Sequence, residues 1–281
     1  MAIKNFIPAV WSEQMLKSID RKYVGVANCN RDFEGDILEK GNVVKICGLN
    51  PVTVSTYTKD SNLTAPQTLS DTLLELKIDQ AKYFNFQIDD IDRTQASPKL
   101  MDYAVKSAAS ALADAADRYV FSVAAEASTQ ISMGAPDVST IIDKMIEART
   151  KLIRRGCVDA EDIVIEVSPD IAEYLFKAKM TSIGDNTELF ENGCIGKILG
   201  CKVFVSNNIA IQQIDDEVCQ HKCIMRTKRA LSFAEQLSEV DAYRPELRFA
   251  DAVKGLHLYG AKIVYQDEIL AMCFNMPMIY E

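Results

Sequence analysis

The stretch SPKLMDYAVKSAASALADAADRYVFSVAAEA, residues 97–127, decides the fold of this chain more than any other part. Ser97 is a favoured N-cap residue and Pro98 is tolerated in the first helical turn, so the pair marks the start of a helix. Apolar residues then recur at helical spacing, while charged residues such as Lys106 and Arg118 occupy the other faces. The stretch therefore predicts one long, alanine-rich helix.

Upstream of this helix, the spacing of apolar residues changes from helical to alternating. The alternating apolar residues are Val52 and Val54, then Leu74, Leu76 and Ile78, then Phe84, Phe86 and Ile88. A period of two is typical of half-buried strands, because successive side chains point to opposite faces. We predict three strands from these patterns.

Residues 57–72 lie between two of the predicted strands and are polar, with little apolar material to pack a core. A structureless stretch of that length is uncommon in a compact domain unless it binds something or reaches another chain. We predict a long hairpin with a projecting tip. Disorder of the same residues is the alternative.

The opening segment, to about residue 28, mixes apolar anchors with charge. Trp11, Met15 and Ile19 share one helical face, which predicts an arm with a short amphipathic helix. This helix either docks on its own core or lies on a neighbouring subunit.

The first six residues lack the features of a secretory signal, so we expect a cytoplasmic protein whose eight cysteines are reduced thiols.

Beyond the long helix, Gly134 and Pro136 are the best candidates for a boundary, because both residue types interrupt regular structure. Helical spacing resumes at residue 141 and ends near residue 155. A further helix is therefore predicted directly after the boundary.

The rest of the chain alternates strands with one more helix. An apolar strand at residues 163–167 leads into Ser168 and Pro169, a second N-cap and first-turn pair that opens a helix. Residues 200–208 read as a strand that runs into a turn, and residues 254–274 supply further strand material. The middle third is predicted to be an α/β module, and the chain closes on strands.

Composition limits the function. The 281 residues are 48% hydrophobic and 25% charged, as in an ordinary folded globular protein. The net charge of -9 argues against tight non-specific binding of nucleic acid, which depends on Lys and Arg. The longest apolar runs are strand-sized, so a membrane span is not predicted.

One cluster has the chemistry of metal ligands. Cys219, His221 and Cys223 supply two thiols and an imidazole that could meet zinc. A structural zinc site takes four ligands, and no second pair of Cys or His has a suitable local spacing. Alternation along a strand places all three residues on one side without any metal. We therefore assign no metal site.

Other candidate sites are weaker. Residues 89–92 are acidic but lack the spaced oxygen ligands and the glycine of a calcium loop, so a solvated strand end explains them better. Residues 193–198 lack the glycine spacing of a phosphate-binding loop and its Ser or Thr after the lysine. His221 and His257 are the only histidines, and no Gly-x-Ser-x-Gly elbow is present. The sequence predicts no catalytic residue, no cofactor-binding residue and no cofactor, and hence no enzyme.

Several short stretches, taken in order, resemble the Hong Kong 97-type major capsid proteins of tailed bacteriophages, particularly the coat proteins of phages from Gram-positive hosts. They are FIPAVWS at residues 6–12, NRDFEG at 30–35 before GNVV at 41–44, DIDRTQA at 90–96, GKILGCKVFVSNN at 196–208 and YGAK at 259–262. Each stretch is weak alone, and their order carries the resemblance over nearly the whole chain.

The resemblance implies an α+β protein with the Hong Kong 97-type capsid fold. Its parts would be an N-terminal arm at residues 1–29, an extended β-hairpin called the E-loop at 30–82, a peripheral domain at 83–135 and 244–281 with its long spine helix at 97–127, and an α/β axial domain at 136–243.

The resemblance also implies a function. Such proteins form pentamers and hexamers that close an icosahedral shell around packaged double-stranded DNA, without sequence-specific binding and without a membrane. A separate scaffolding protein and a portal would be partners, and the protein would lie in the virion capsid after assembly in the bacterial host cytoplasm. The alternatives are an encapsulin-like compartment that encloses cargo enzymes, an accessory protein that stops at small rings, and a cytoplasmic α/β enzyme.

Overall fold

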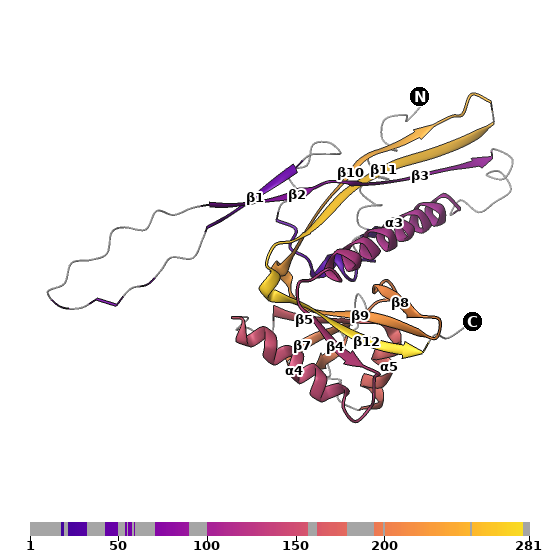
Figure 1. The fold of residues 1–281 in the computed structure, drawn as a ribbon. Helices are drawn as coiled ribbons and strands as arrows, with labels where there is room; N and C mark the ends of the chain where they lie inside the picture. Colours follow the sequence, from indigo (N-terminus) through magenta and orange to yellow (C-terminus); the bar gives the residue numbers. More distant parts are fainter. Residues whose placement is uncertain are drawn as a thin grey trace.

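The computed structural model describes residues 18–19, 22–32, 43–49, 54, 56–57, 59, 71–89, 100–156, 162–178, 194–198, 200–247 and 249–277. A long helix, α3 (Leu100–Ala124), lies along a narrow three-stranded sheet, and a larger sheet covered by two helices forms a second body beside it (Figure 1). The α+β class predicted from the sequence is confirmed. Helix α3 confirms the predicted long helix, although Ser97 and Pro98 lie outside the described residues.

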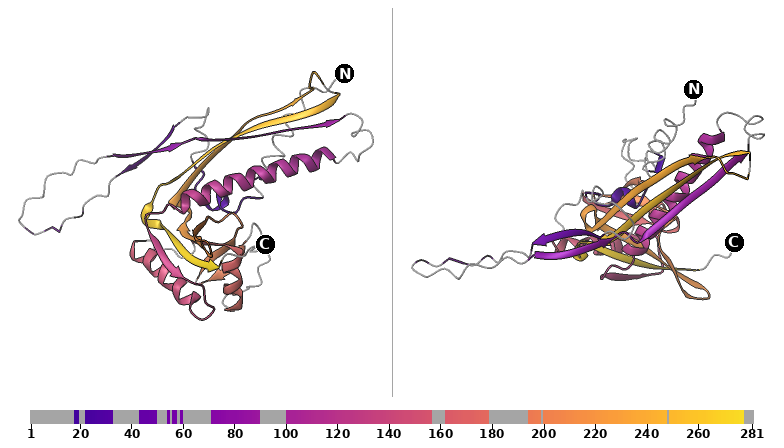
Figure 2. Two further views of the ribbon diagram at one scale, coloured as in Figure 1. Left: turned by 45° about the vertical axis from the view of Figure 1, so that its right-hand side comes forward. Right: turned by 90° about the horizontal axis from the view of Figure 1, so that it is seen from above.

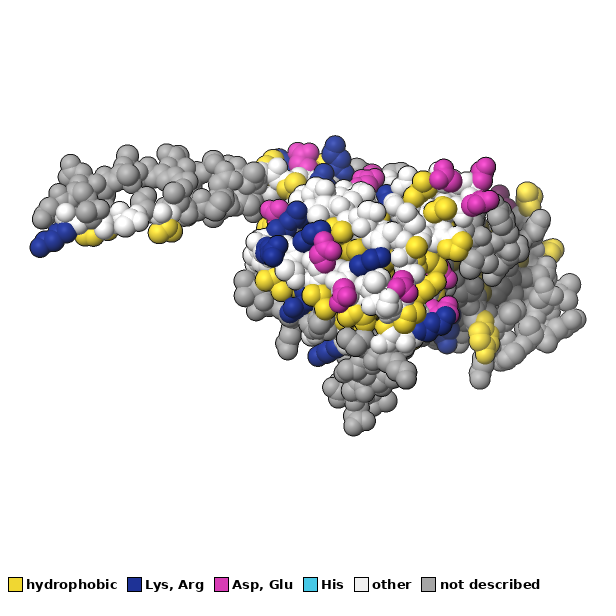
Figure 3. All heavy atoms as spheres, turned by 60° about the horizontal axis from the view of Figure 1, so that its bottom comes forward, with side chains coloured by type: hydrophobic (Ala, Val, Ile, Leu, Met, Phe, Trp, Pro, Cys, Tyr) yellow, Lys and Arg dark blue, Asp and Glu magenta, His cyan; other side chains and the backbone are white. Residues whose placement is uncertain are grey.

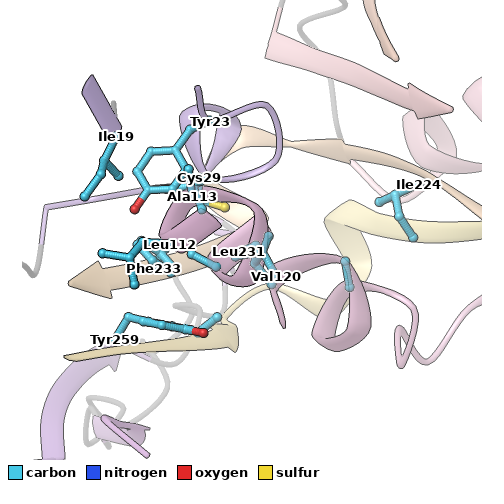
Figure 4. Packing of buried hydrophobic residues seen from close by; sticks show 14 of the residues in the cluster. Ile19, Tyr23, Cys29, Leu112, Ala113, Val120, Ile224, Leu231, Phe233 and Tyr259 are labelled. Atoms are coloured by element: carbon cyan, nitrogen blue, oxygen red, sulfur yellow. The ribbon is translucent and has the colours of Figure 1, made fainter. Parts of the chain in front are cut away.

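The three-stranded sheet is antiparallel and has the order β10-β11-β3. Its strands are β3 (Gln80–Asp89), β10 (Leu231–Tyr243) and β11 (Ala250–Ile263). Phe84 and Phe86 of β3 pack against the core that α3 covers, while Tyr83 and Asn85 are exposed on the other face, as the alternation predicts. Apolar residues of α3 at helical spacing, such as Leu112 and Val120, fill the space between helix and sheet (Figure 4).

The larger sheet has seven strands, with the order β4-β12-β9-β5-β7-β6 and β8 paired to β9. Its strands are β4 (Gln130–Gly134), β5 (Ile163–Val167), β6 (Cys194–Ile198), β7 (Cys201–Val205), β8 (Ile211–Asp215), β9 (Val218–Thr227) and β12 (Ile269–Pro277). Helices α4 (Ile141–Arg154) and α5 (Pro169–Lys177) pack on one face through one shared apolar core. Both helices confirm the predicted ones, and Ser168 and Pro169 open α5 as expected.

A hairpin of β1 (Val43–Leu49) and β2 (Asp71–Lys77) extends away from both sheets (Figure 2). Its base is anchored, because Val44, Ile46 and Leu76 are buried and pack against Leu258 of β11. Most of the residues that join β1 to β2 lie outside the described part, and so does Val52 of the strand predicted from Val52 and Val54. Val54, which is described, is exposed and belongs to no strand.

The short 3-10 helices mark where the chain changes direction. They are η1 (Val26–Asn28), η5 (Lys228–Ala230) and η6 (Gln266–Glu268). At η5 the chain passes from β9 of the large sheet into β10 of the small one, and at η6 it returns from β11 into β12. The two bodies are therefore joined by two adjacent crossings as well as by the chain between α3 and β4.

These crossings group the strands into sheets that do not follow the residue ranges expected for the domains. An axial domain at residues 136–243 would include β10, which pairs with β11 along nearly its whole length. A peripheral domain at 244–281 would include β12, which instead pairs with β9 and β4. The sequence marks no boundary at either crossing, because neither contains Pro or Gly. Strands β4, β6, β8 and β10 were not predicted.

Candidate functional site

The cluster that resembles metal ligands is only partly assembled. Cys219 Sγ lies 3.5 Å from His221 Nε2 on β9, while His221 Nδ1 lies 2.8 Å from Ser168 Oγ and 3.6 Å from Asp170 Oδ2. Burial lowers the pKa of His221, although Asp170 opposes this shift. Cys223 is fully buried, and burial raises the pKa of its thiol to about 12. In the part of the chain that is described, no three His, Cys, Asp or Glu side chains are grouped to hold a metal ion.

The other candidate sites from the sequence analysis lie in strands or outside the described residues. Residue 89 is the last residue of β3, and residues 90 and 92 lie outside the described part. Residues 194–198 form β6, a strand that pairs with β7. His257 Nε2 lies 2.8 Å from Glu235 Oε2 inside the core.

A buried ion pair fixes the N-terminal segment, residues 22–32, to the large sheet. Arg226 of β9 is fully buried and donates from Nε and Nη2 to the two carboxylate oxygens of Glu166 on β5, each at 2.9 Å. It also donates to the backbone oxygens of Asn28, at 2.7 Å, and Gly25, at 2.9 Å. Burial lowers the pKa of Arg226, but the adjacent Glu166 carboxylate raises it above its ordinary value. Arg226 therefore supplies donors to two backbone carbonyls of the N-terminal segment, and its charge is balanced by Glu166.

Asp117 of α3 holds the same segment from the opposite side. Its carboxylate accepts hydrogen bonds from the backbone N–H groups of Val24 and Val26, each at 2.9 Å. Burial raises the pKa of Asp117 to about 6, even though these backbone donors lower it. The N-terminal segment is thus bonded both to α3 and to the large sheet.

A second buried cluster joins the N-terminal segment to the small sheet. Tyr23 donates from its hydroxyl to Glu235 of β10, which also accepts from Arg31 Nη2 at 2.5 Å. Burial raises the pKa of Glu235, but His257, Tyr23 and Arg31 together lower it below its ordinary value. Tyr23 also packs against Phe233 in the core below α3 (Figure 4). These buried groups join the N-terminal segment to the small sheet and hold the subunit together.

Of the three residues that define the predicted amphipathic opening helix, only Ile19 is described, so it alone shows whether this helix docks on its own core. Ile19 is buried in the same core as Tyr23 and Phe233. Trp11 and Met15 lie outside the described residues. At Ile19, therefore, the arm packs on its own subunit.

Exposed apolar side chains lie at the extremities of the molecule. Val54 and Tyr57 follow β1 in the projecting hairpin, and Val54 is 94% exposed. Leu247, which is 98% exposed, and Phe249 lie in the turn between β10 and β11. Contiguous apolar patches mark interaction sites, and apolar side chains at a projecting end can contribute to such a patch with another molecule.

One open groove lies on the small sheet, where Tyr83, Asn85, Lys254 and Leu256 are among the residues that line it. Its volume is about 260 Å³, which is below the roughly 300–1,000 Å³ typical of small-molecule sites. The arrangement is suited to contacts between protein surfaces. In addition, no helix in the described ranges is long and apolar enough to cross a membrane.

Solved structures with the same arrangement include several from phages. A chain of Mycobacterium phage Che8 is 29% identical, with a TM-score of 0.69, covering 96% of this chain and 98% of that chain. The capsid of Ralstonia phage GP4 gives a TM-score of 0.68 at 12% identity, covering 93% and 91%. The mature capsid of bacteriophage PhiM1 gives 0.62 at 15% identity, covering 83% and 82%. No protein-family model and no curated protein matches the sequence.

This chain therefore shares its arrangement, a long helix under a narrow sheet, a second helix-covered sheet and a projecting hairpin, with solved structures from phages, two of which are capsids. The chain has the Hong Kong 97-type fold, which confirms the fold that the resemblance in the sequence implied.

Proposed function

We propose that this chain assembles into pentamers and hexamers that close an icosahedral shell around packaged phage double-stranded DNA. The observation that carries the proposal is the hairpin of β1 and β2. Its base is packed into the subunit core, whereas Val54 and Tyr57 beyond β1 are exposed. A hairpin anchored at one end with apolar side chains beyond its own core is suited to lie across the next subunit.

The charge of the chain fits a container for DNA. A net charge of -9 gives the protein little attraction for phosphate, so packaged DNA would not be trapped on the shell. The proposed partners are further copies of the chain, a separate scaffolding protein and a portal. Assembly would take place in the bacterial host cytoplasm, and the protein would end in the virion capsid.

We also propose a division into domains that follows the two sheets. The peripheral domain would consist of β3, α3, β10 and β11, and the axial domain of β4 to β9, β12, α4 and α5. The arm and the E-loop hairpin keep the ranges expected from the sequence, 1–29 and 30–82.

The alternatives receive less support. The likeness to phage capsids does not favour an encapsulin-like compartment over a phage shell. It also indicates a structural role, which argues against the cytoplasmic enzyme. An accessory protein that stops at small rings is distinguished from a capsid protein by the size of its assemblies.

The test is to express the chain alone and together with its neighbouring genes, and to study both preparations by negative-stain microscopy and size-exclusion chromatography with light scattering. We expect closed shells tens of nanometres across, or regular tubes and sheets, from at least one preparation. A monodisperse monomer or a small ring in both would contradict the proposal. Shells that contain folded protein cargo instead of nucleic acid would favour the compartment.

A further inference from the structure

One cysteine of the large sheet differs from the others in its exposure. Among the six cysteines whose side chains the structure describes, Cys219 is partly exposed and the other five are buried. It lies near the start of β9, opposite Gln213 of β8 and Met276 of β12. Of these six residues, it is therefore the one that a reagent in solution can approach.

His221, two residues further along β9, is placed to take the proton of this thiol. Alternate residues of a strand share a face, and the ring leans toward Cys219, so that Nε2 lies 3.5 Å from Sγ. Burial lowers the pKa of the imidazole below its ordinary value, and the nearby Asp170 carboxylate opposes this shift only in part. The ring is therefore neutral at pH 7, and one of its two nitrogens is free to accept a proton.

The start of α5 determines which nitrogen is free. His221 Nδ1 lies 2.8 Å from Ser168 Oγ and 3.6 Å from Asp170 Oδ2. A carboxylate only accepts hydrogen bonds, so these neighbours favour the tautomer with its proton on Nδ1 and leave the lone pair of Nε2 toward Cys219. Among the described side chains on the face shown in Figure 3, none is a histidine, in keeping with the burial of this ring. A nucleophile, a base within its reach and a group that orients the base form the arrangement that activates thiols in proteins.

The surroundings of Cys219 and His221 add little charge. The four residues opposite them in β8 and β12 are all uncharged, and they are Ile211, Gln213, Phe274 and Met276. Cys223, on the same face of β9, is fully buried, and burial raises the pKa of its thiol to about 12, so this thiol stays neutral. In the described part of the chain, Asp170 is therefore the charged group that acts on His221.

The backbone oxygen of Met276 is the competing partner for the thiol proton, because it lies 3.6 Å from Cys219 Sγ. A thiol that donates to this carbonyl keeps its proton and reacts slowly, whereas a thiol that passes its proton to His221 reacts as a thiolate. The two cases differ in what happens when the imidazole is removed.

We propose that Cys219 is a modification site for low-molecular-weight disulfides and that His221 is its base. The Cys219 proton passes to His221 Nε2, the sulfur attacks one sulfur of the disulfide, and the S–S bond breaks as the new S–S bond forms. The departing thiolate takes the proton from the imidazolium. The products are a mixed disulfide on Cys219 and one free thiol, so the disulfide is the only oxidant required.

The test follows the reaction of the full, unassembled chain with dithiobis(nitrobenzoate), a disulfide that releases a coloured thiolate, and locates the adduct by mass spectrometry of peptides. An ordinary thiol, with a pKa of about 8.5, is only about 3% ionised at pH 7, so its rate falls about thirtyfold between pH 9.5 and pH 7. We expect the rate at Cys219 to fall by less than about fivefold, because His221 takes the proton. The His221→Gln variant should react about tenfold more slowly than the wild type at pH 7 and at a similar rate at pH 9.5, where the thiol ionises without a base.

The matched control is Gln220→Ala, since Gln220 lies between the two residues and bonds to Asn275 instead. It should react like the wild type, whereas Cys219→Ser should lose the adduct. Circular dichroism verifies that each variant is folded, and the pH profile of the wild type decides the matter by itself if His221→Gln does not fold. Equal rates for the wild type and His221→Gln at pH 7, or a thirtyfold fall in the wild type, would overturn the inference and leave the proposed function untouched.

Discussion

At the scale of single residues, the buried pair of Arg226 and Glu166 is the strongest candidate for a large effect on stability. Changing Arg226 to Met leaves the Glu166 carboxylate buried without its cation and removes one hydrogen bond each from the carbonyls of Gly25 and Asn28. We expect the free energy of unfolding of the unassembled subunit to fall by about 3–5 kcal/mol. Urea denaturation followed by circular dichroism measures this difference.

The matched control is Arg229→Met, because Arg229 is exposed and pairs with Glu268 at 2.5 Å. Loss of an exposed pair costs roughly 0–1 kcal/mol. A double variant with Glu166→Leu and Arg226→Met should lose less than the sum of the single changes, since neither charge is then left alone. Equal costs for the Arg226 and Arg229 variants would contradict the assignment.

Asp117 gives a prediction about pH. Its pKa is raised from 3.8 to about 6 in the folded chain, chiefly by burial, so between those values the folded state binds a proton that the unfolded state does not. The contribution of Asp117 to stability is therefore greatest below pH 4 and decreases as the pH rises toward 6, by about 3 kcal/mol in total. Free energies of unfolding between pH 4 and pH 6.5 should show this decrease in the wild type but not in Asp117→Asn. If the free energies of unfolding of the two proteins change in parallel with pH, the predicted contribution of Asp117 is refuted.

These residues also show which contacts could not be predicted from the sequence. Glu166 stands in an otherwise apolar strand, whose five residues are all buried. A charged residue there signals a buried partner, but nothing in the sequence identifies Arg226, which is 60 positions away. Tyr23 and Glu235 are 212 positions apart. Contacts of this kind depend on how the sheets are assembled, and local pattern does not contain that information.

At the scale of elements, Gly260 allows the base of the hairpin to pass over β11. A Cβ atom at this position would lie 2.2 Å from the backbone oxygen of Lys77, so Gly260→Ala requires the backbone to move. We expect a loss of about 1–3 kcal/mol in the free energy of unfolding and faster proteolysis near β2. The control is Gly134→Ala, where no atom lies within 4 Å and only the positive φ of 61° opposes the change. If Gly260→Ala lowers the free energy of unfolding no more than the control does, the close approach of Lys77 to Gly260 does not matter for stability.

The projecting hairpin should be dispensable for folding and necessary for assembly. Deleting residues 57–72 leaves the buried anchors of its base, such as Val44, Ile46 and Leu76, in place. We expect a subunit with wild-type circular dichroism that forms no shells under conditions in which the wild type does. Microscopy and light scattering check this result, and normal shells from the deleted chain would contradict the proposed role.

Elements were predictable where local pattern determines them. The helix of residues 97–127 appears as α3, and Ser168 and Pro169 begin α5 as expected. The side chain of Ser168 makes no capping bond, because its hydroxyl lies 2.8 Å from His221 Nδ1. The sequence did not predict which sheet β10 and β12 join, since a strand can fit either sheet and only tertiary pairing decides.

At the scale of the whole molecule, the subunit should unfold as one unit despite its two sheets. The N-terminal segment is bonded to α3 through Asp117 and to the large sheet through Arg226. It also forms a bridge from Asn30 to Ser232 of the small sheet. Beside it, the crossings η5 and η6 are joined by Arg229 and Glu268. Buried polar contacts that span two bodies make it costly for either body to unfold alone.

We therefore expect one transition when the unassembled wild-type subunit is unfolded in urea, with the same midpoint by circular dichroism and by hydrogen exchange of peptides from β5 and β11. The Arg226→Met variant should separate these midpoints, because it removes the bonds from β9 to the N-terminal segment while leaving both apolar cores intact. The Arg229→Met variant should keep them together, since the pair that it breaks is exposed. Separate midpoints for β5 and β11 in the wild type would show that the two sheets are independent domains and that the N-terminal segment does not couple them.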